Sequence, residues 1–125
     1  ATEPDGWISQ WSDPTPGGSE STANETIQHL SDAPRADSIV HIGDLSYAVG
    51  FLAKWELFMN QIQKIASTVP YMTGMGNHER DWPGTGSIGG EDSGGECGTP
   101  TQARFRMPTP SRKQEDGWWS VDIGS

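Results

Sequence analysis

The stretch "SIVHIGDLSYAVGFLAKWELFMNQIQKIASTVPYMTGMGNHE", residues 38–79, decides the fold. Its first part, 38–43, is short, apolar and rich in β-branched residues, which is typical of a buried strand. From Phe51 to Ala66 the apolar residues recur at helical spacing, and residues 68–75 again favour a strand. Strand, helix and strand in this order predict a βαβ unit with two parallel strands. The expected fold class is therefore α/β.

A polar loop follows each of the two predicted strands. "GDLSY" (43–47) comes after the first strand, and "GNHE" (76–79) comes after the second. Because the functional loops of an open α/β sheet lie at the carboxyl ends of its strands, we expect these two loops to meet at one edge.

The rest of the chain predicts one modest domain with long irregular connections. "TANE" is a capping box that predicts a helix with Thr22 as its N-cap, ended by Pro34 and lying on the sheet. The domain, 1–125, is expected to divide into a loop (1–20), a helix–β–α–β core (21–80), a glycine-rich loop region (81–117) and a third strand (118–124).

Composition excludes several classes of protein. The net charge is −9, from 17 acidic and 8 basic residues, and no basic face for nucleic acid is visible. No apolar run reaches membrane-spanning length. The single cysteine, Cys97, is either a free thiol or has a partner outside this chain. Six tryptophans argue against a disordered chain.

The first polar loop carries two candidate metal ligands. Asp44 stands behind Gly43, directly after a strand, where a carboxylate can bind or bridge hard metal ions. Tyr47 is three residues further on, and a tyrosinate needs a strongly Lewis-acidic ion such as Fe(III), since its free pKa is about 10. For this loop alone, the reading in which Asp44 caps a turn and Tyr47 packs on the helix is favoured, because short motifs arise by chance.

The second polar loop adds Asn77, whose carbonyl oxygen suits a divalent ion, and His78, which can bind metal or donate to a phosphate oxygen. Glu79 and Arg80 are expected to form a local ion pair. The two loops together favour a metal site over a pair of turns, because one crossover helix joins them.

The remaining polar residues are given no role in the site. His41 is expected to be a satisfied core histidine, and His29 is expected to be solvated. The acidic loop residues are interpreted as surface charge; they are Asp81, Glu91, Asp92, Glu96 and Asp116.

The two motifs resemble signature blocks of the calcineurin-like metallophosphoesterases and, within them, of the purple acid phosphatases. "TVPYM" (68–72), "ERDWP" (79–83) and "DSGGECG" (92–98) resemble the branch of large plant-type and protist members. The Ser/Thr protein phosphatases are a poorer match, since they carry Asp-Arg-Gly where this chain has Tyr47-Ala48-Val49.

The resemblance implies a role for each residue of the two blocks. Asp44 would bridge two metal ions, Tyr47 would be the phenolate on Fe(III), and Asn77 would bind the second, divalent ion (Zn, Mn or Fe). His78 would contact the phosphate of the substrate. The implied substrates are phosphomonoesters, nucleotide pyrophosphates or diesters, hydrolysed at two metal ions.

The departures from the family pattern are as informative. The aspartate of an upstream "DxG" block and three downstream histidine ligands have no counterpart here. We therefore expect a partial metallophosphoesterase domain that forms an incomplete sandwich. Its expected partner is the missing remainder of the same catalytic domain, and the chain alone is expected to have little activity. The family and the "NET" sequon at Asn24 favour a secreted or vacuolar glycoprotein. Two alternatives stay open: a non-catalytic interaction module and an iron-free metallophosphodiesterase.

Overall fold

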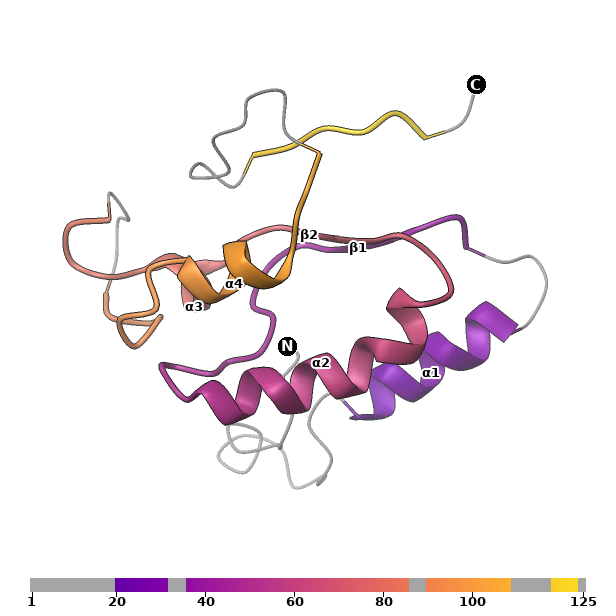
Figure 1. Cartoon of the computed structure of the whole chain (residues 1–125), viewed down its shortest axis with the longest axis horizontal. Coiled ribbons are helices and arrows are strands. Elements are labelled where there is room, and N and C mark those ends of the chain that lie inside the picture. The colour runs from indigo at the N-terminus through magenta and orange to yellow at the C-terminus, as the bar shows by residue number, and fades with distance from the viewer. Residues whose placement is uncertain (1–19, 32–35, 86–89, 109–117, 124–125) are drawn as a thin grey trace.

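The computed structural model describes residues 20–31, 36–85, 90–108 and 118–123. Its elements are α1 (Glu20–Ser31), β1 (Ile39–His41), α2 (Leu52–Ala66), β2 (Tyr71–Thr73), α3 (Asn77–Arg80) and α4 (Thr99–Arg104) (Figure 1). Of the predicted loop at residues 1–20, residues 1–19 lie outside the described residues, as do Pro34 and Asp116. No helix among the described residues is long and apolar enough to cross a membrane.

The βαβ unit is confirmed, because β1 and β2 pair in parallel with Ile39 opposite Tyr71, and α2 connects them. Both strands are shorter than predicted. The expectation of a buried first strand is wrong for one of its faces, since Val40 is 49% exposed and Ile42 is 85% exposed. Alternate side chains of a strand point to opposite faces, and α1 and α2 both lie on the same side of the strand pair (Figure 1).

Helix α2 supplies four of the eight buried hydrophobic residues in the described part of the chain. Trp55, Phe58, Ile62 and Ile65 are buried along one stripe, as the helical spacing of the apolar residues predicted. The first three of these pack with Leu45, Ala48 and Phe105. Each such side chain contributes about 1.5–3 kcal/mol when fully buried. The core therefore anchors the first polar loop directly to α2, through Leu45 within the loop and Ala48 immediately after it.

One predicted helix start and one predicted strand are wrong. Helix α1 begins at Glu20, so Thr22 lies within its first turn, and the Thr22 carbonyl accepts a hydrogen bond from Thr26 Oγ1 at 2.8 Å. Residues 118–123 form no strand in the described part of the chain. This segment is held instead by a side chain, since Trp119 Nε1 donates to the Thr73 carbonyl at 2.6 Å.

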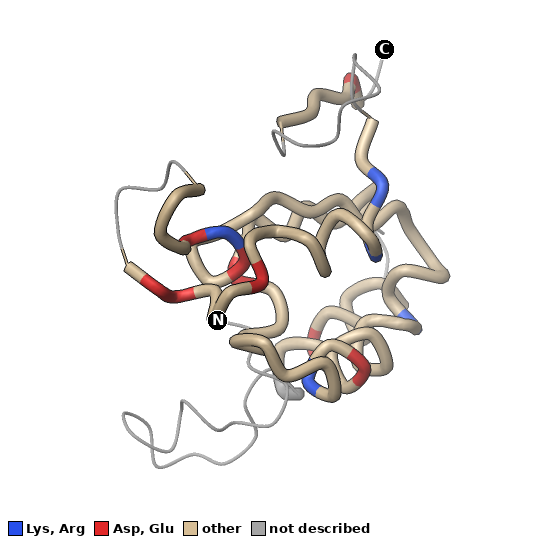
Figure 2. Tube along the Cα trace, turned by 60° about the vertical axis from the view of Figure 1, so that its left-hand side comes forward, with Lys and Arg blue, Asp and Glu red and all other residues tan. Residues whose placement is uncertain are grey.

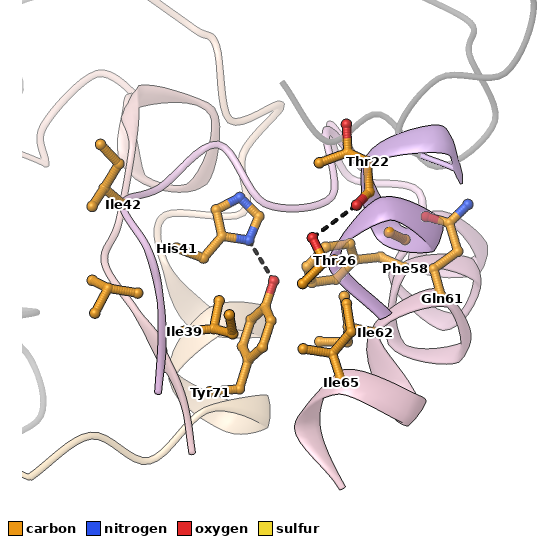
Figure 3. Close-up of a pocket in the computed structure, with 12 residues that line it drawn as sticks. Thr22, Thr26, Ile39, His41, Ile42, Phe58, Gln61, Ile62, Ile65 and Tyr71 are labelled. Atoms are coloured by element: carbon orange, nitrogen blue, oxygen red, sulfur yellow. Dashed lines mark hydrogen bonds between the residues drawn. The ribbon is translucent and has the colours of Figure 1, made fainter. Parts of the chain in front are cut away.

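An apolar pocket of about 210 Å³ lies between α1, α2 and the strand pair (Figure 3). Two hydrogen bonds join residues that line it: His41 Nδ1 lies 2.7 Å from the Tyr71 hydroxyl, and Thr26 Oγ1 donates to the Thr22 carbonyl. Burial lowers the pKa of His41, and burial raises the pKa of Tyr71 to about 12. The interpretation of His41 as a satisfied core histidine is confirmed.

Candidate metal centre

The two polar loops meet through glycine backbones. Gly43 has a φ of +99°, and a Cβ added to it would lie 2.5 Å from the Gly76 nitrogen. A Cβ on Gly76 would overlap the Asp44 side chain and lie 2.6 Å from the Asp44 nitrogen. The approach is therefore too close for any side chain at either position. The predicted convergence of the loops is confirmed.

Glu79 holds the two loops together. Its side chain is 1% exposed, and its two oxygens accept hydrogen bonds from the backbone N–H groups of Asp44 (2.8 Å), Leu45 (2.7 Å) and Gly76 (2.9 Å). The predicted local ion pair with Arg80 is wrong, because this carboxylate is turned inward to the backbone. The missed signal is its position: Glu79 stands three residues after Gly76, the N-cap of α3, which is the spacing of a capping box.

Opposing effects act on the pKa of the Glu79 carboxyl. Burial raises the pKa of this carboxyl, and the nearby charge of Asp44 adds to that shift. The three backbone N–H donors oppose the shift, because they stabilise the ionised form. The group is therefore a buried structural acid whose position depends on the amides that surround it.

The first polar loop is conformationally strained. Asp44, Tyr47 and Val49 have φ angles of 56°, 48° and 49°. Left-handed backbone at residues other than glycine costs about 1–3 kcal/mol each, and the surrounding structure must enforce it. Glu79 and the buried side chains of Leu45 and Ala48 supply that constraint. Such strain aims the side chains of the loop in directions that a relaxed turn would not give.

Asp44, Tyr47 and His78 are brought together by this arrangement. The Tyr47 hydroxyl donates to Asp44 Oδ2 at 3.0 Å, and the His78 backbone N–H lies 3.4 Å from Asp44 Oδ1. The rings of Tyr47 and His78 have centroids 4.3 Å apart. His78 Nδ1 is buried and has no hydrogen-bond partner within the described residues. A buried polar atom of this kind needs a partner, and a bound anion or metal ion would supply one.

Asn77 begins α3, and its side chain is exposed. Its amide Nδ2 donates to Asp92 Oδ2 at 3.0 Å. Asp92 is exposed, as expected of a surface charge, and it also contacts a candidate ligand. Glu96, also assigned to surface charge, accepts hydrogen bonds from Gly50 N and from Trp55 Nε1, both at 3.0 Å. Glycine-rich sequence without periodicity offered no signal for either contact.

The donor set fits hard cations in part. A carboxylate, a phenol and an amide carbonyl are oxygen ligands, which hard metal ions prefer. Several acidic residues of the described chain lie in and around α3, beside Arg80 (Figure 2), and such a group of negative charges attracts cations. Within the described residues, however, no group of three or more His, Cys, Asp or Glu side chains could hold a metal ion. The described residues therefore offer only part of a ligand set.

Comparisons with known proteins agree with this fold. A model of the family "Calcineurin-like phosphoesterase" matches residues 10–122, so the chain belongs to the calcineurin-like phosphoesterases and covers part of their α/β domain. Within this family its relatives are purple acid phosphatases. A purple acid phosphatase isolated from yellow lupin (Lupinus luteus) seeds superimposes with a TM-score of 0.75 at 48% identity, over 90% of this chain and 20% of that one.

Most of the sequence relatives are named as purple acid phosphatases, and one is named for another phosphoesterase activity. "Probable inactive purple acid phosphatase 27" of Arabidopsis thaliana is 45% identical over 92% of this chain and 18% of its own length. "Nucleotide pyrophosphatase/phosphodiesterase" of Hordeum vulgare is 42% identical over 81% of this chain and 27% of its own length. The chain thus spans less than a third of the relatives that it matches.

Proposed function

We propose that this chain is part of a phosphoric ester hydrolase with a dinuclear Fe(III)–M(II) centre, where M is Zn, Mn or Fe. Asp44 would bridge the two ions, Tyr47 would bind Fe(III) as a phenolate, and Asn77 would bind the divalent ion. The observation that carries the proposal is the convergence of Asp44, Tyr47 and His78 from two strand ends, with His78 Nδ1 buried and unpartnered within the described residues.

The residues of this chain would divide the work of hydrolysis. When bound, the metal ions supply polarisation of the ester and a water molecule of lowered pKa. His78 would orient the substrate by donating a hydrogen bond to a phosphate oxygen as charge develops there. Tyr47 would give up the proton that it now donates to Asp44 Oδ2. The hydrogen bonds of Glu79 would fix the two loops that carry Asp44 and Asn77, so that these side chains need little rearrangement to bind the metal ions.

Two finer assignments rest on the relatives and on the sequence. The barley relative is named a nucleotide pyrophosphatase/phosphodiesterase, which favours nucleotide pyrophosphates and diesters beside phosphomonoesters as substrates. Asn24 is exposed on α1 and would carry an N-glycan in a secreted or vacuolar protein. The parts of the catalytic domain outside this chain would complete the ligand set, and the chain alone would turn over little substrate.

A second candidate function is a non-catalytic member of the family. Three relatives that match 81–92% of this chain carry "Probable inactive" in their names. Such a protein would keep the loops and the fold and lose the chemistry, and it would serve as a binding module.

Metal analysis with a visible spectrum on the full-length protein separates these candidates. The proposal expects iron, a divalent ion and a tyrosinate–iron absorption band that Tyr47→Phe abolishes, together with hydrolysis of p-nitrophenyl phosphate or a nucleotide pyrophosphate. A metal-replete protein without the band supports the iron-free metallophosphodiesterase. A folded protein that takes up no metal and hydrolyses neither substrate overturns the proposal in favour of the binding module.

A further inference from the structure

We infer that Asp92 is a positioning residue that orients the Asn77 amide for the divalent metal ion, an inference that rests on the function proposed above. The contact is direct, with Asn77 Nδ2 donating to Asp92 Oδ2 at 3.0 Å. A carboxylate can only accept hydrogen bonds, so the amide must turn its NH₂ group toward Asp92. The carbonyl oxygen of Asn77, the atom that binds cations, then faces away from Asp92.

The contact also changes the chemistry of the amide. A donor group held by an anion leaves more negative charge on the carbonyl oxygen of the same amide, because the two ends are conjugated. Carboxylates that hydrogen-bond to the far side of a ligand raise its basicity and set its orientation, as they do for metal-bound histidines. Asp92 would act on Asn77 in this way without touching the metal ion.

The loop that carries Asp92, residues 90–98, is tied to the site along its length. The Ser93 N–H donates to the Asp81 carbonyl at 3.1 Å, and the Gly98 N–H donates to the Glu79 carbonyl at 2.7 Å. The Ser93 side chain is fully buried. The 90–98 loop is therefore fastened at two points that follow Asp92 in the chain, by the two residues that flank Arg80.

A second attachment connects the 90–98 loop to the core. Both oxygens of Glu96 accept from Trp55 Nε1, at 3.0 and 3.1 Å, and Trp55 is 1% exposed on α2. Gly94 packs so closely on Val49 that a Cβ there would lie 2.5 Å from the Val49 carbonyl carbon. A loop held in this way keeps the Asp92 carboxylate at one position, which a free surface loop would not do.

Three variants of the full-length protein test the inference. Asp92→Ala removes the acceptor; Asp92→Asn keeps an oxygen that can accept the same hydrogen bond; and Glu91→Ala, on the neighbouring exposed residue, removes an equal charge from the same loop. Zn²⁺ affinity is measured by competition with a chromophoric chelator on iron-loaded protein, and the tyrosinate–iron band is recorded in parallel.

The expected result is a loss of about 10–100-fold in Zn²⁺ affinity for Asp92→Ala, the range usual for residues that support metal ligands. Asp92→Asn recovers most of the affinity, Glu91→Ala keeps it, and the iron band is intact in all three. Unchanged affinity in Asp92→Ala overturns the inference. An equal loss in Glu91→Ala also overturns it, because the charge of the loop would then explain the effect. An equal loss in Asp92→Asn overturns it as well, because the hydrogen bond that orients the amide would then contribute nothing.

A crystal structure of Asp92→Ala tests the orientation of the Asn77 amide without depending on metal uptake. If the wild-type protein takes up no Zn²⁺, that result counts against the proposed function and not against this inference. Loss of the single Asn77 orientation supports the inference. An Asn77 amide that stays ordered in the orientation described here overturns it.

Discussion

Replacing Glu79 tests the claim that one buried carboxylate joins the two loops of the site. Glu79→Ala removes the acceptor of three backbone N–H groups, those of Asp44, Leu45 and Gly76. The Leu45 contact is buried, and the other two are partly buried. A buried donor left unsatisfied costs about 1–3 kcal/mol, and a hydrogen bond to a charged group contributes about 1.5–3 kcal/mol. Glu79→Ala is therefore expected to lower the free energy of unfolding by about 3–6 kcal/mol.

Glu79→Gln should cost less, because the amide keeps one oxygen. Placed where it serves Asp44 and Gly76, that oxygen preserves two of the three contacts, while the NH₂ group faces the Leu45 donor. The expected loss is about 1–3 kcal/mol. Glu56→Ala is the matched control, since Glu56 pairs with Arg104 at 2.9 Å on an exposed side chain, and exposed ion pairs contribute about 0–1 kcal/mol.

Urea unfolding of the full-length protein measures these losses, and hydrogen–deuterium exchange localises them. Peptides that cover residues 43–48 and 74–80 should lose protection in Glu79→Ala and keep it in Glu56→Ala. Bound metal should fall in step, because Asp44 and Asn77 are no longer held in register. The reasoning is refuted if Glu79→Ala stays within about 1 kcal/mol of the wild type and both peptides keep their protection.

Three further perturbations follow from the same structure. Gly76→Ala should destabilise by more than about 3 kcal/mol in urea unfolding, because its Cβ meets Asp44 backbone, whereas Gly90→Ala, with 3.8 Å to its nearest neighbour, should stay within about 0.5 kcal/mol; equal effects would contradict the packing. Burial lowers the pKa of His41 from its ordinary 6.5, so the unfolded state binds more protons below that pH and stability falls as the pH drops from 6.5 toward the lowered pKa. His41→Gln should flatten this part of the pH–stability profile, and a profile of unchanged slope would show that other groups cause it. Trp55→Phe removes the indole donor to Glu96 and should cost about 2–4 kcal/mol with faster exchange in residues 90–98; unaltered exchange there would show that the loop is held by other contacts.

The sequence predicted the elements whose signals are periodic or local. The stripe Trp55, Phe58, Ile62 and Ile65 predicted α2, and β-branched runs on both sides of it predicted the parallel pair. These patterns report burial on one face of an element, which is a property of the residues themselves. The start of α1 was misplaced by two residues, because a capping box inside a helix looks the same in sequence as one at its end.

The contacts of the 90–98 loop could not be predicted, because they join residues far apart in the chain. Asp92 and Glu96 look like solvated charges in a glycine-rich stretch, yet one meets Asn77 and the other meets Trp55, 41 residues away. No period marks such a contact. Its energy comes from hydrogen bonds whose partners only the folded chain defines.

The "GNHE" loop holds two kinds of information, and they answer different questions. Gly76 and Glu79 hold the loops in contact through backbone packing and backbone hydrogen bonds, which any member of the fold needs whether or not it is an enzyme. Asn77 and His78 contribute less to this contact: His78 reaches Asp44 through its backbone N–H at 3.4 Å and packs its ring on Tyr47, and its Nδ1 is buried without a partner in the described residues. A buried polar atom that stability does not use costs free energy, so its retention argues for a ligand. The glycine and the glutamate therefore support the fold alone, while Asn77 and His78 are the residues that bear on whether a catalytic metal centre exists here.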